Sequence, residues 1–116
     1  MTKYKIQYWL YAILNSKFGS EVKFTRDSLH SMYEVNRHGF EISTNTMNLS
    51  LVESWLEDKL ISSDFSINRD YSFEKSFVKL KNNQQIYISL RKQDRGAGYQ
   101  NRNKAVLYVH IGLYKK

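Results

Sequence analysis

Three ionisable side chains in the second half of the chain have the chemistry needed to cleave RNA without a metal ion. Such cleavage requires a base for the 2′-hydroxyl, an acid for the leaving oxygen and a cation beside the phosphate. His110, Glu74 and either Arg91 or Arg95 supply groups of these kinds. Nothing in their spacing predicts that they meet. We therefore assign no catalytic residue and keep a small metal-independent ribonuclease as an alternative.

A second group, His30, Glu34 and His38, recurs at four-residue steps, a spacing that can place two metal ligands on one side of a helix. Gly39 follows at once and Asn36 is a helix-ending residue, so we interpret the group as an exposed polar face. The chain has no cysteine, which excludes disulfides, zinc–thiolate sites and a cysteine nucleophile. We predict neither a metal nor a cofactor.

Aromatic and basic side chains alternate with apolar ones near the carboxyl terminus. If the apolar set faces the helices, pleat alternation places the others on the outer face of a sheet. The inward set is Val78, Leu80, Ile86, Ile88, Leu90, Leu107, Val109, Ile111 and Leu113, and the outward set is Phe77, Lys79, Lys81, Tyr87, Ser89, Arg91, Tyr108, His110 and Tyr114. Such a face can stack unpaired bases and neutralise phosphates. The alternative is that the aromatic residues are ordinary strand formers.

The connection from Lys92 to Lys104 is thirteen residues long and too polar for a core. Loops of this length tend to be functional or disordered. Arg95 and Arg102 can clamp phosphates and Tyr99 can stack, whereas the alternative is a solvated hairpin loop. With this loop, the predicted nucleic-acid site comprises Lys79, Lys81, Tyr87, Arg91, Lys92, Arg95, Tyr99, Arg102, Lys104, Tyr108 and His110.

The 116 residues predict a single domain, 1–116, with 41% hydrophobic and 15% aromatic residues for its core. The net charge is +7, and the excess lies in residues 65–116, which carry eleven basic and three acidic side chains. This asymmetry favours an anionic partner, nucleic acid first and an acidic protein second. No stretch approaches the roughly 18 apolar residues of a membrane span. We expect a cytoplasmic protein that does not associate with membranes.

Three helices are predicted in residues 1–64. Apolar residues at three- and four-residue steps indicate a helix from Lys5 to Lys17 with Gly19 as its stop. Thr25 can cap a second helix that carries Leu29, Met32 and Tyr33. The third helix runs from Ser50 to Ile61, because Ser50 and Glu53 have the spacing of a capping box.

Alternation replaces helical periodicity after residue 64. It predicts strands at Ser76–Lys81, Gln85–Arg91 and Ala105–Tyr114, with Asn82–Gln84 as a hairpin turn between the first two. A further strand at Phe65–Phe73 is less well defined. The predicted fold is α+β: three N-terminal helices in a winged-helix-like order, followed by a small antiparallel sheet of three or four strands. Residues 1–64 would be mainly a helical support for a basic sheet and loop.

The helix order favours a non-enzymatic DNA-binding regulator over an RNA-binding protein. The third helix is a poor recognition helix, however, because its side chains include Glu53, Glu57 and Asp58. Binding is therefore assigned to the sheet, or wing, and to the 92–104 loop. The alternatives are the ribonuclease and an interaction protein that inhibits a host nucleic-acid enzyme.

Tyrosines at positions 4, 8 and 11 form a second stripe on the first predicted helix, opposite its apolar side. A helix with two apolar or aromatic sides is usually buried on both. Tyr4, Tyr8 and Tyr11 are therefore the predicted interface of a homodimer, which would suit a DNA-binding protein that reads two half-sites.

Overall fold

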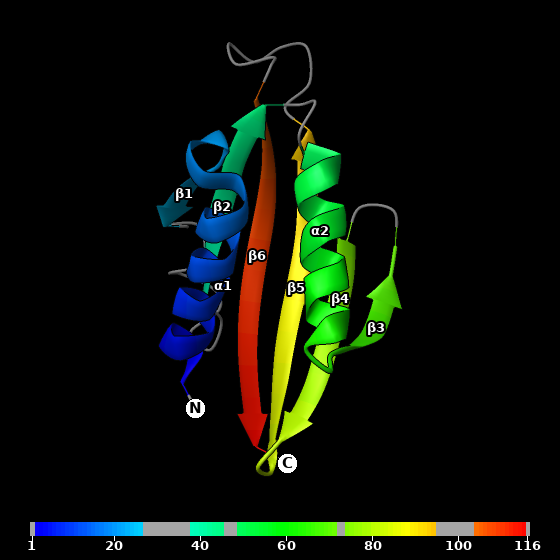
Figure 1. Cartoon of the computed structure of the whole chain (residues 1–116). Helices are drawn as coiled ribbons and strands as arrows, with labels where there is room; N and C mark the ends of the chain where they lie inside the picture. Colours follow the sequence, from blue (N-terminus) through cyan, green and yellow to red (C-terminus); the bar gives the residue numbers. More distant parts are fainter. Residues whose placement is uncertain (1, 27–37, 46–48, 72–73, 95–103, 116) are drawn as a thin grey trace.

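The computed structural model describes residues 2–26, 38–45, 49–71, 74–94 and 104–115. In this part of the chain, two α-helices cover one face of a six-stranded antiparallel sheet (Figure 1). The strand order is β1-β2-β6-β5-β4-β3. The elements along the chain are α1 (Lys3–Phe18), the short 3-10 helix η1 (Gly19–Glu21), β1 (Lys23–Arg26), β2 (His38–Asn45), α2 (Leu49–Ser62), β3 (Ser66–Asp70), β4 (Glu74–Lys81), β5 (Gln84–Asp94) and β6 (Lys104–Lys115).

Helix α1 is the helix predicted at Lys5–Lys17, extended by two residues at its start and by one at its end. The Thr2 hydroxyl caps it by accepting a hydrogen bond of 3.2 Å from the Lys5 backbone N–H. Gly19 ends it with a φ of 56°, a left-handed conformation that glycine adopts without steric cost. The predicted stop at Gly19 is confirmed.

The fold class predicted from the sequence is wrong in its count of helices and strands. Thr25, the expected cap of a second helix, lies in β1, and residues 27–37 lie outside the described part. Residues 38–45 form β2, which pairs with both β1 and β6 and buries Phe40 and Ile42 completely. These strands separate α1 from α2, so the winged-helix order does not apply. Helices make up most of the described part of residues 1–64, but β1 and β2 belong to the sheet.

The third predicted helix is α2, but its expected capping box is absent. The helix begins at Leu49, so Ser50 lies inside the first turn. Glu53 is buried and forms an ion pair of 3.2 Å with Lys92 of β5. Its carboxylate therefore holds the helix to the sheet.

The hairpin between β4 and β5 changes which face of the sheet each β4 side chain occupies. Its turn is Asn82-Asn83, both with positive φ, and Lys81 pairs with Gln84. A turn of three residues, as predicted, would have shifted the register by one and reversed every β4 side chain. Phe77 therefore packs beside Ile88 under the helices. Lys79 and Lys81 share that face, while Val78 and Leu80 face outward.

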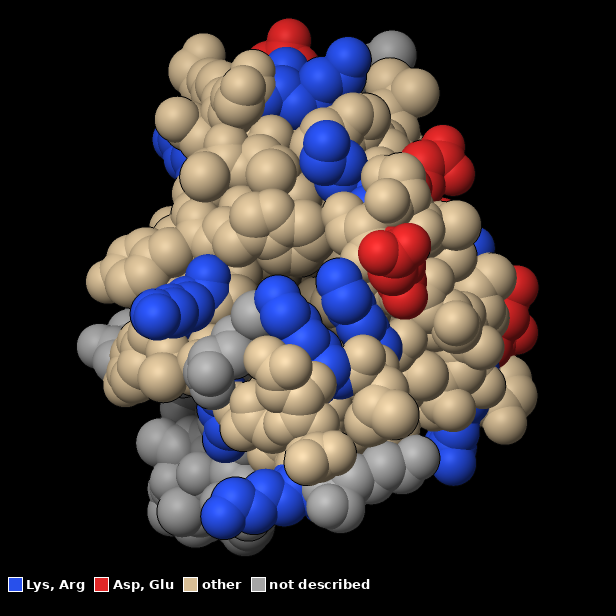
Figure 2. Space-filling view, turned by 60° about the horizontal axis from the view of Figure 1, so that its bottom comes forward, with Lys and Arg blue, Asp and Glu red and all other residues tan. Residues whose placement is uncertain are grey.

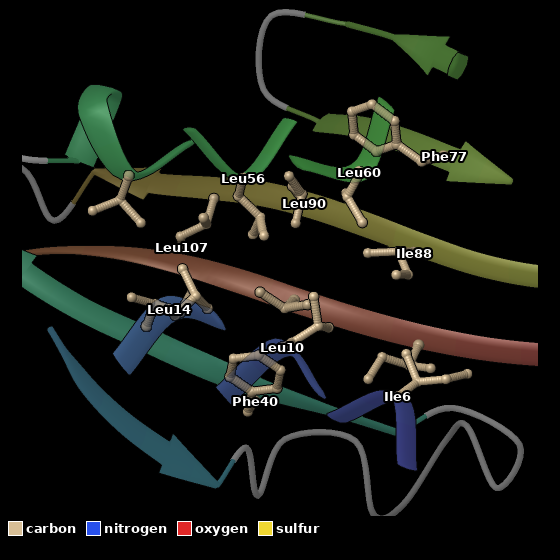
Figure 3. Packing of buried hydrophobic residues seen from close by; sticks show 14 of the residues in the cluster. Ile6, Leu10, Leu14, Phe40, Leu56, Leu60, Phe77, Ile88, Leu90 and Leu107 are labelled. Atoms are coloured by element: carbon tan, nitrogen blue, oxygen red, sulfur yellow. The ribbon is translucent and has the colours of Figure 1, made fainter. Parts of the chain in front are cut away.

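The core lies between the helices and the sheet (Figure 3). Two aromatic contacts join α1 to α2 and to the residues that follow α2. Phe18 of α1 meets Trp55 of α2 edge-on, with ring centroids 5.5 Å apart. Trp9 lies nearly parallel to Phe65, with centroids 6.5 Å apart. Figure 3 labels ten of the buried side chains: Ile6, Leu10, Leu14, Phe40, Leu56, Leu60, Phe77, Ile88, Leu90 and Leu107.

A second ion pair fixes α2 to β4. Lys75 Nζ lies 2.6 Å from Glu57 Oε1. The hydrogen bond to Glu57 is the main reason that the pKa of Lys75 is raised above its usual value of 10.5. Because the folded-state pKa is the higher one, the pair stabilises the fold fully below about pH 10.5 and loses this contribution as pH rises through the folded pKa.

We expect Glu57→Gln to lower the free energy of unfolding by about 1 kcal/mol near neutral pH, since the pair is only partly buried. The difference from the wild type should shrink above the folded pKa of Lys75, where the amine is neutral. Urea denaturation at about pH 8 and about pH 11.5 measures this. Asp58→Asn, on the exposed side of α2, is the matched control. A difference that stays constant over this range would contradict the assignment to Lys75.

None of the described helices is long and apolar enough to cross a lipid bilayer.

Candidate nucleic-acid interface at the basic end of the sheet

The structure divides the predicted nucleic-acid site between two faces of the sheet. Tyr87, Arg91, Tyr108 and His110 lie on the outer face, as predicted. Lys79 and Lys81 lie on the helix-covered face, so their predicted place is wrong. Lys92 is paired with Glu53. The remaining residues of the predicted site lie outside the described part, namely Arg95, Tyr99, Arg102 and the side chain of Lys104.

Around the middle of β6 the outer face offers little aromatic surface to a ligand, whereas Tyr114, near the end of the strand on the same face, is 43% exposed. Tyr108 and His110 are each only 7% exposed, and their rings stack on one another with centroids 6.4 Å apart. Arg91 is exposed, and Tyr87 is half-buried. Base stacking needs an accessible ring face, so Tyr108 and His110 are poorly placed to stack bases.

The three groups considered for RNA cleavage do share this outer face. Glu74 pairs with Arg91 across β4 and β5, and His110 pairs with Ser89. The Ser89 hydroxyl donates a hydrogen bond of 2.9 Å to Glu74 Oε1. Spacing along the chain could not show this convergence. Burial of His110 leaves its imidazole poorly placed to reach a 2′-hydroxyl, so the arrangement favours a structural role.

A cavity of about 370 Å³ lies on the other face, at the end of the sheet where the β4–β5 hairpin turns. It is bounded by the first turns of α1, the connection from α2 to β3, and the adjoining ends of β4 and β5. Its described lining is Lys5, Ile6, Trp9, Ser63, Asp64, Phe65, Lys79, Lys81 and Ile86. Of these residues, only Lys79 and Lys81 belong to the nucleic-acid site predicted from the sequence.

The end of α2 positions the aromatic wall of this cavity. Asp64 has a φ of 72° and its N–H donates to the Ile61 carbonyl, while the Phe65 N–H donates to the Leu60 carbonyl. These two bonds form a Schellman motif, with aspartate in the left-handed position that glycine usually occupies. The motif turns the chain sharply and places Phe65 against Trp9 of α1.

Lys79 is held in place at the cavity wall. Its Nζ donates a hydrogen bond of 2.8 Å to the Ser63 carbonyl and lies 5.6 Å from the centroid of the Phe65 ring. An ammonium group has three N–H donors, so this bond leaves donor capacity toward a ligand. Lys5 and Lys81 are exposed at the rim. The cavity therefore combines the hydrogen-bonded ammonium group of Lys79, the exposed ammonium groups of Lys5 and Lys81, and aromatic side chains.

Further basic and aromatic residues lie toward the same end of the molecule, outside the described cavity lining. The amino end of α1, the β4–β5 hairpin and the carboxyl end of β6 meet at this end of the molecule (Figure 1). Figure 2 brings the end forward and shows Lys and Arg side chains gathered around its middle. Tyr4, Tyr8 and Tyr114 are 56%, 67% and 43% exposed, and Lys115 is exposed. We call these residues and the cavity lining the basic end.

Only two of the three tyrosines in the predicted dimer interface are exposed. Tyr11 packs against Phe24 and Phe40, with ring centroids 4.8 and 4.6 Å away, and its hydroxyl accepts a hydrogen bond from Gln7 Nε2. Tyr11 thus belongs to the packing of α1 on β1 and β2. Tyr4 and Tyr8 are 56% and 67% exposed, and the Tyr8 ring meets that of Tyr11 edge-on, with centroids 6.4 Å apart.

Comparison with protein families, curated proteins and solved structures gives no significant match. Within the described residues, no three His, Cys, Asp or Glu side chains are grouped so that they could hold a metal ion.

Proposed function

We propose that the protein binds single-stranded nucleic acid at the basic end and performs no reaction on it. The observation that carries the proposal is the meeting of Lys5, Lys79 and Lys81 with the partly exposed ring of Trp9 in one cavity, where the buried Phe65 supports that ring from behind. Proteins that bind single strands combine cations that follow the phosphates with aromatic rings that stack the bases. The net charge of +7 adds long-range attraction toward a polyanion.

A single strand suits this arrangement better than a duplex. Both described helices pack along the sheet, and neither projects from the molecule as a recognition helix would. On helix α2, Glu53 and Glu57 are held in ion pairs with Lys92 and Lys75, and the exposed Asp58 opposes approach to phosphates. The exposed rings of Tyr8 and Tyr114 can stack unpaired bases but cannot reach bases inside a duplex.

Fluorescence anisotropy with a labelled single strand of about eight nucleotides tests the proposal. If the three lysines of the cavity each neutralise one phosphate, log affinity should fall against log salt with a slope of roughly −2. A duplex of the same sequence should bind more weakly.

Trp9 provides an independent reading of where the strand binds. The Trp55→Phe variant leaves Trp9 as the one tryptophan of the chain, and its fluorescence should change on addition of the strand. Absence of binding at about 50 mM salt would refute the proposal. Capture of an acidic protein without affinity for nucleic acid would instead favour an interaction protein.

A further inference from the structure

The cavity ends against the hydrophobic core. Its described lining includes Ile6 and Ile86, which are 5% and 3% exposed and belong to the packed layer between α1 and the sheet. A ligand can therefore enter from solvent but cannot continue through the protein. The volume of about 370 Å³ lies near the lower limit for small-molecule sites, which begin at about 300 Å³. The cavity thus suits one terminal group rather than a length of continuous strand.

The charge of the cavity distinguishes between two kinds of phosphate. Its described lining holds three lysines and one aspartate, Asp64. An internal phosphodiester carries a single negative charge, whereas a phosphomonoester carries about −1.5 to −2 near neutral pH. The excess of two positive charges matches the phosphomonoester more closely.

The aromatic side supplies the remaining recognition. Trp9 and Phe65 line the cavity beside Lys79, whose ammonium group is already oriented by the Ser63 carbonyl. A nucleoside monophosphate presents a flat base and a doubly charged phosphate within a short distance of each other. The Asp64 carboxylate repels the phosphate from its own part of the rim and thereby directs it toward the lysines.

We infer that the cavity receives the phosphorylated terminal nucleotide of a single strand. This inference rests on the proposed function and adds the chemical group that the cavity recognises. The same chemistry occurs at a 5′-phosphate, at a 3′-phosphate and in a free nucleoside monophosphate, so the experiment compares all three.

Anisotropy competition with one sequence in four forms tests the inference: 5′-phosphorylated, 3′-phosphorylated, ending in hydroxyls on both sides, and circular. One of the phosphorylated forms should bind about tenfold more tightly than the hydroxyl-ended and circular forms, because it offers additional charge-assisted hydrogen bonds. Free nucleoside monophosphate should compete for this preference at lower concentration than inorganic phosphate, since it also contacts Trp9 and Phe65.

The Lys79→Gln variant should abolish the tenfold preference, because it should weaken binding of the phosphorylated strand more than binding of the hydroxyl-ended strand. Lys115→Gln removes the same charge at the basic end but outside the described cavity lining, and it should keep the preference. Competition on the wild-type protein needs no variant, so the test stands even if Lys79→Gln unfolds.

Equal affinity of the wild type for all four forms would overturn the inference and leave the proposed function intact. Absence of binding to every form would overturn both. Competition by inorganic phosphate as strong as that by nucleoside monophosphate would also overturn the inference, because it would show that the base is not recognised.

Discussion

Replacement of Leu10 by alanine should lower the free energy of unfolding by about 2–5 kcal/mol. Leu10 is completely buried between α1 and the sheet. Alanine would remove apolar contacts and leave a cavity that the rigid strands below cannot fill. The effect is large for a domain of this size, whose whole stability is expected to be about 5–15 kcal/mol.

Leu51→Ala is the matched control for this prediction. It makes the same substitution on a helix, but Leu51 is 64% exposed on α2. Its effect on the free energy of unfolding should stay within about 0.5 kcal/mol. Urea denaturation of the three proteins measures the difference. Similar stability of the two variants would contradict the packing of α1 on the sheet, and with it the position of Lys5 and Trp9 at the cavity.

Reversal of charge at the rim should give the largest effect on binding. We expect the double variant Lys5→Glu/Lys81→Glu to lower affinity for a single strand by about 30-fold or more at low salt. Both residues are exposed, so the fold should tolerate the change. Two attractions toward phosphate become two repulsions, and anisotropy titrations record the loss.

A second double variant distinguishes the effect of charge at the cavity rim from the effect of the net charge of the protein. Lys17→Glu/Lys23→Glu lowers the net charge by the same amount, at exposed positions near the carboxyl end of α1 and the start of β1. It should weaken binding by only about threefold, through loss of long-range attraction. If both double variants lose affinity equally, binding depends on net charge alone and the basic end is not a specific site.

Local patterns in the sequence were sufficient to predict some of the elements. Helix α1 is marked by apolar residues at helical spacing and by Gly19, and β6 by strict alternation. The hairpin at Asn82-Asn83 is confirmed as well, because these asparagines tolerate positive φ. In each case the information lies within one short segment of the chain.

Strands β1 and β2 could not be predicted in the same way, because pairing with distant segments determines them. Residues 38–45 form a strand by pairing with β6, from Asn45 with Lys104 to His38 with Ile111, which are 59 and 73 positions apart in sequence. The face of the sheet that Lys79 occupies depends on the length of the β4–β5 turn, because one more residue in this turn would place Lys79 on the other face. Neither effect appears in local periodicity.

The candidate site was harder to predict than the fold, because its residues come from four separate segments. Lys5 and Trp9 belong to α1, Phe65 follows α2, and Lys79 and Ile86 lie on neighbouring strands. The four-residue spacing of Lys5 and Trp9 was the available indication that they share a side of a helix. The basic excess of residues 65–116 correctly included Lys79 and Lys81 but could not show which face they occupy.

An NMR titration of ¹⁵N-labelled protein with a phosphorylated single strand tests the central claim most directly. If the basic end binds the strand, chemical shifts should change first at the Trp9 indole and at the backbone amides of Lys5, Phe65 and Lys79. The amides of Arg91 and His110 on the outer face should remain unchanged. Changes confined to the outer face, with the cavity residues unaffected, would contradict the account and return the binding site to the surface around Arg91.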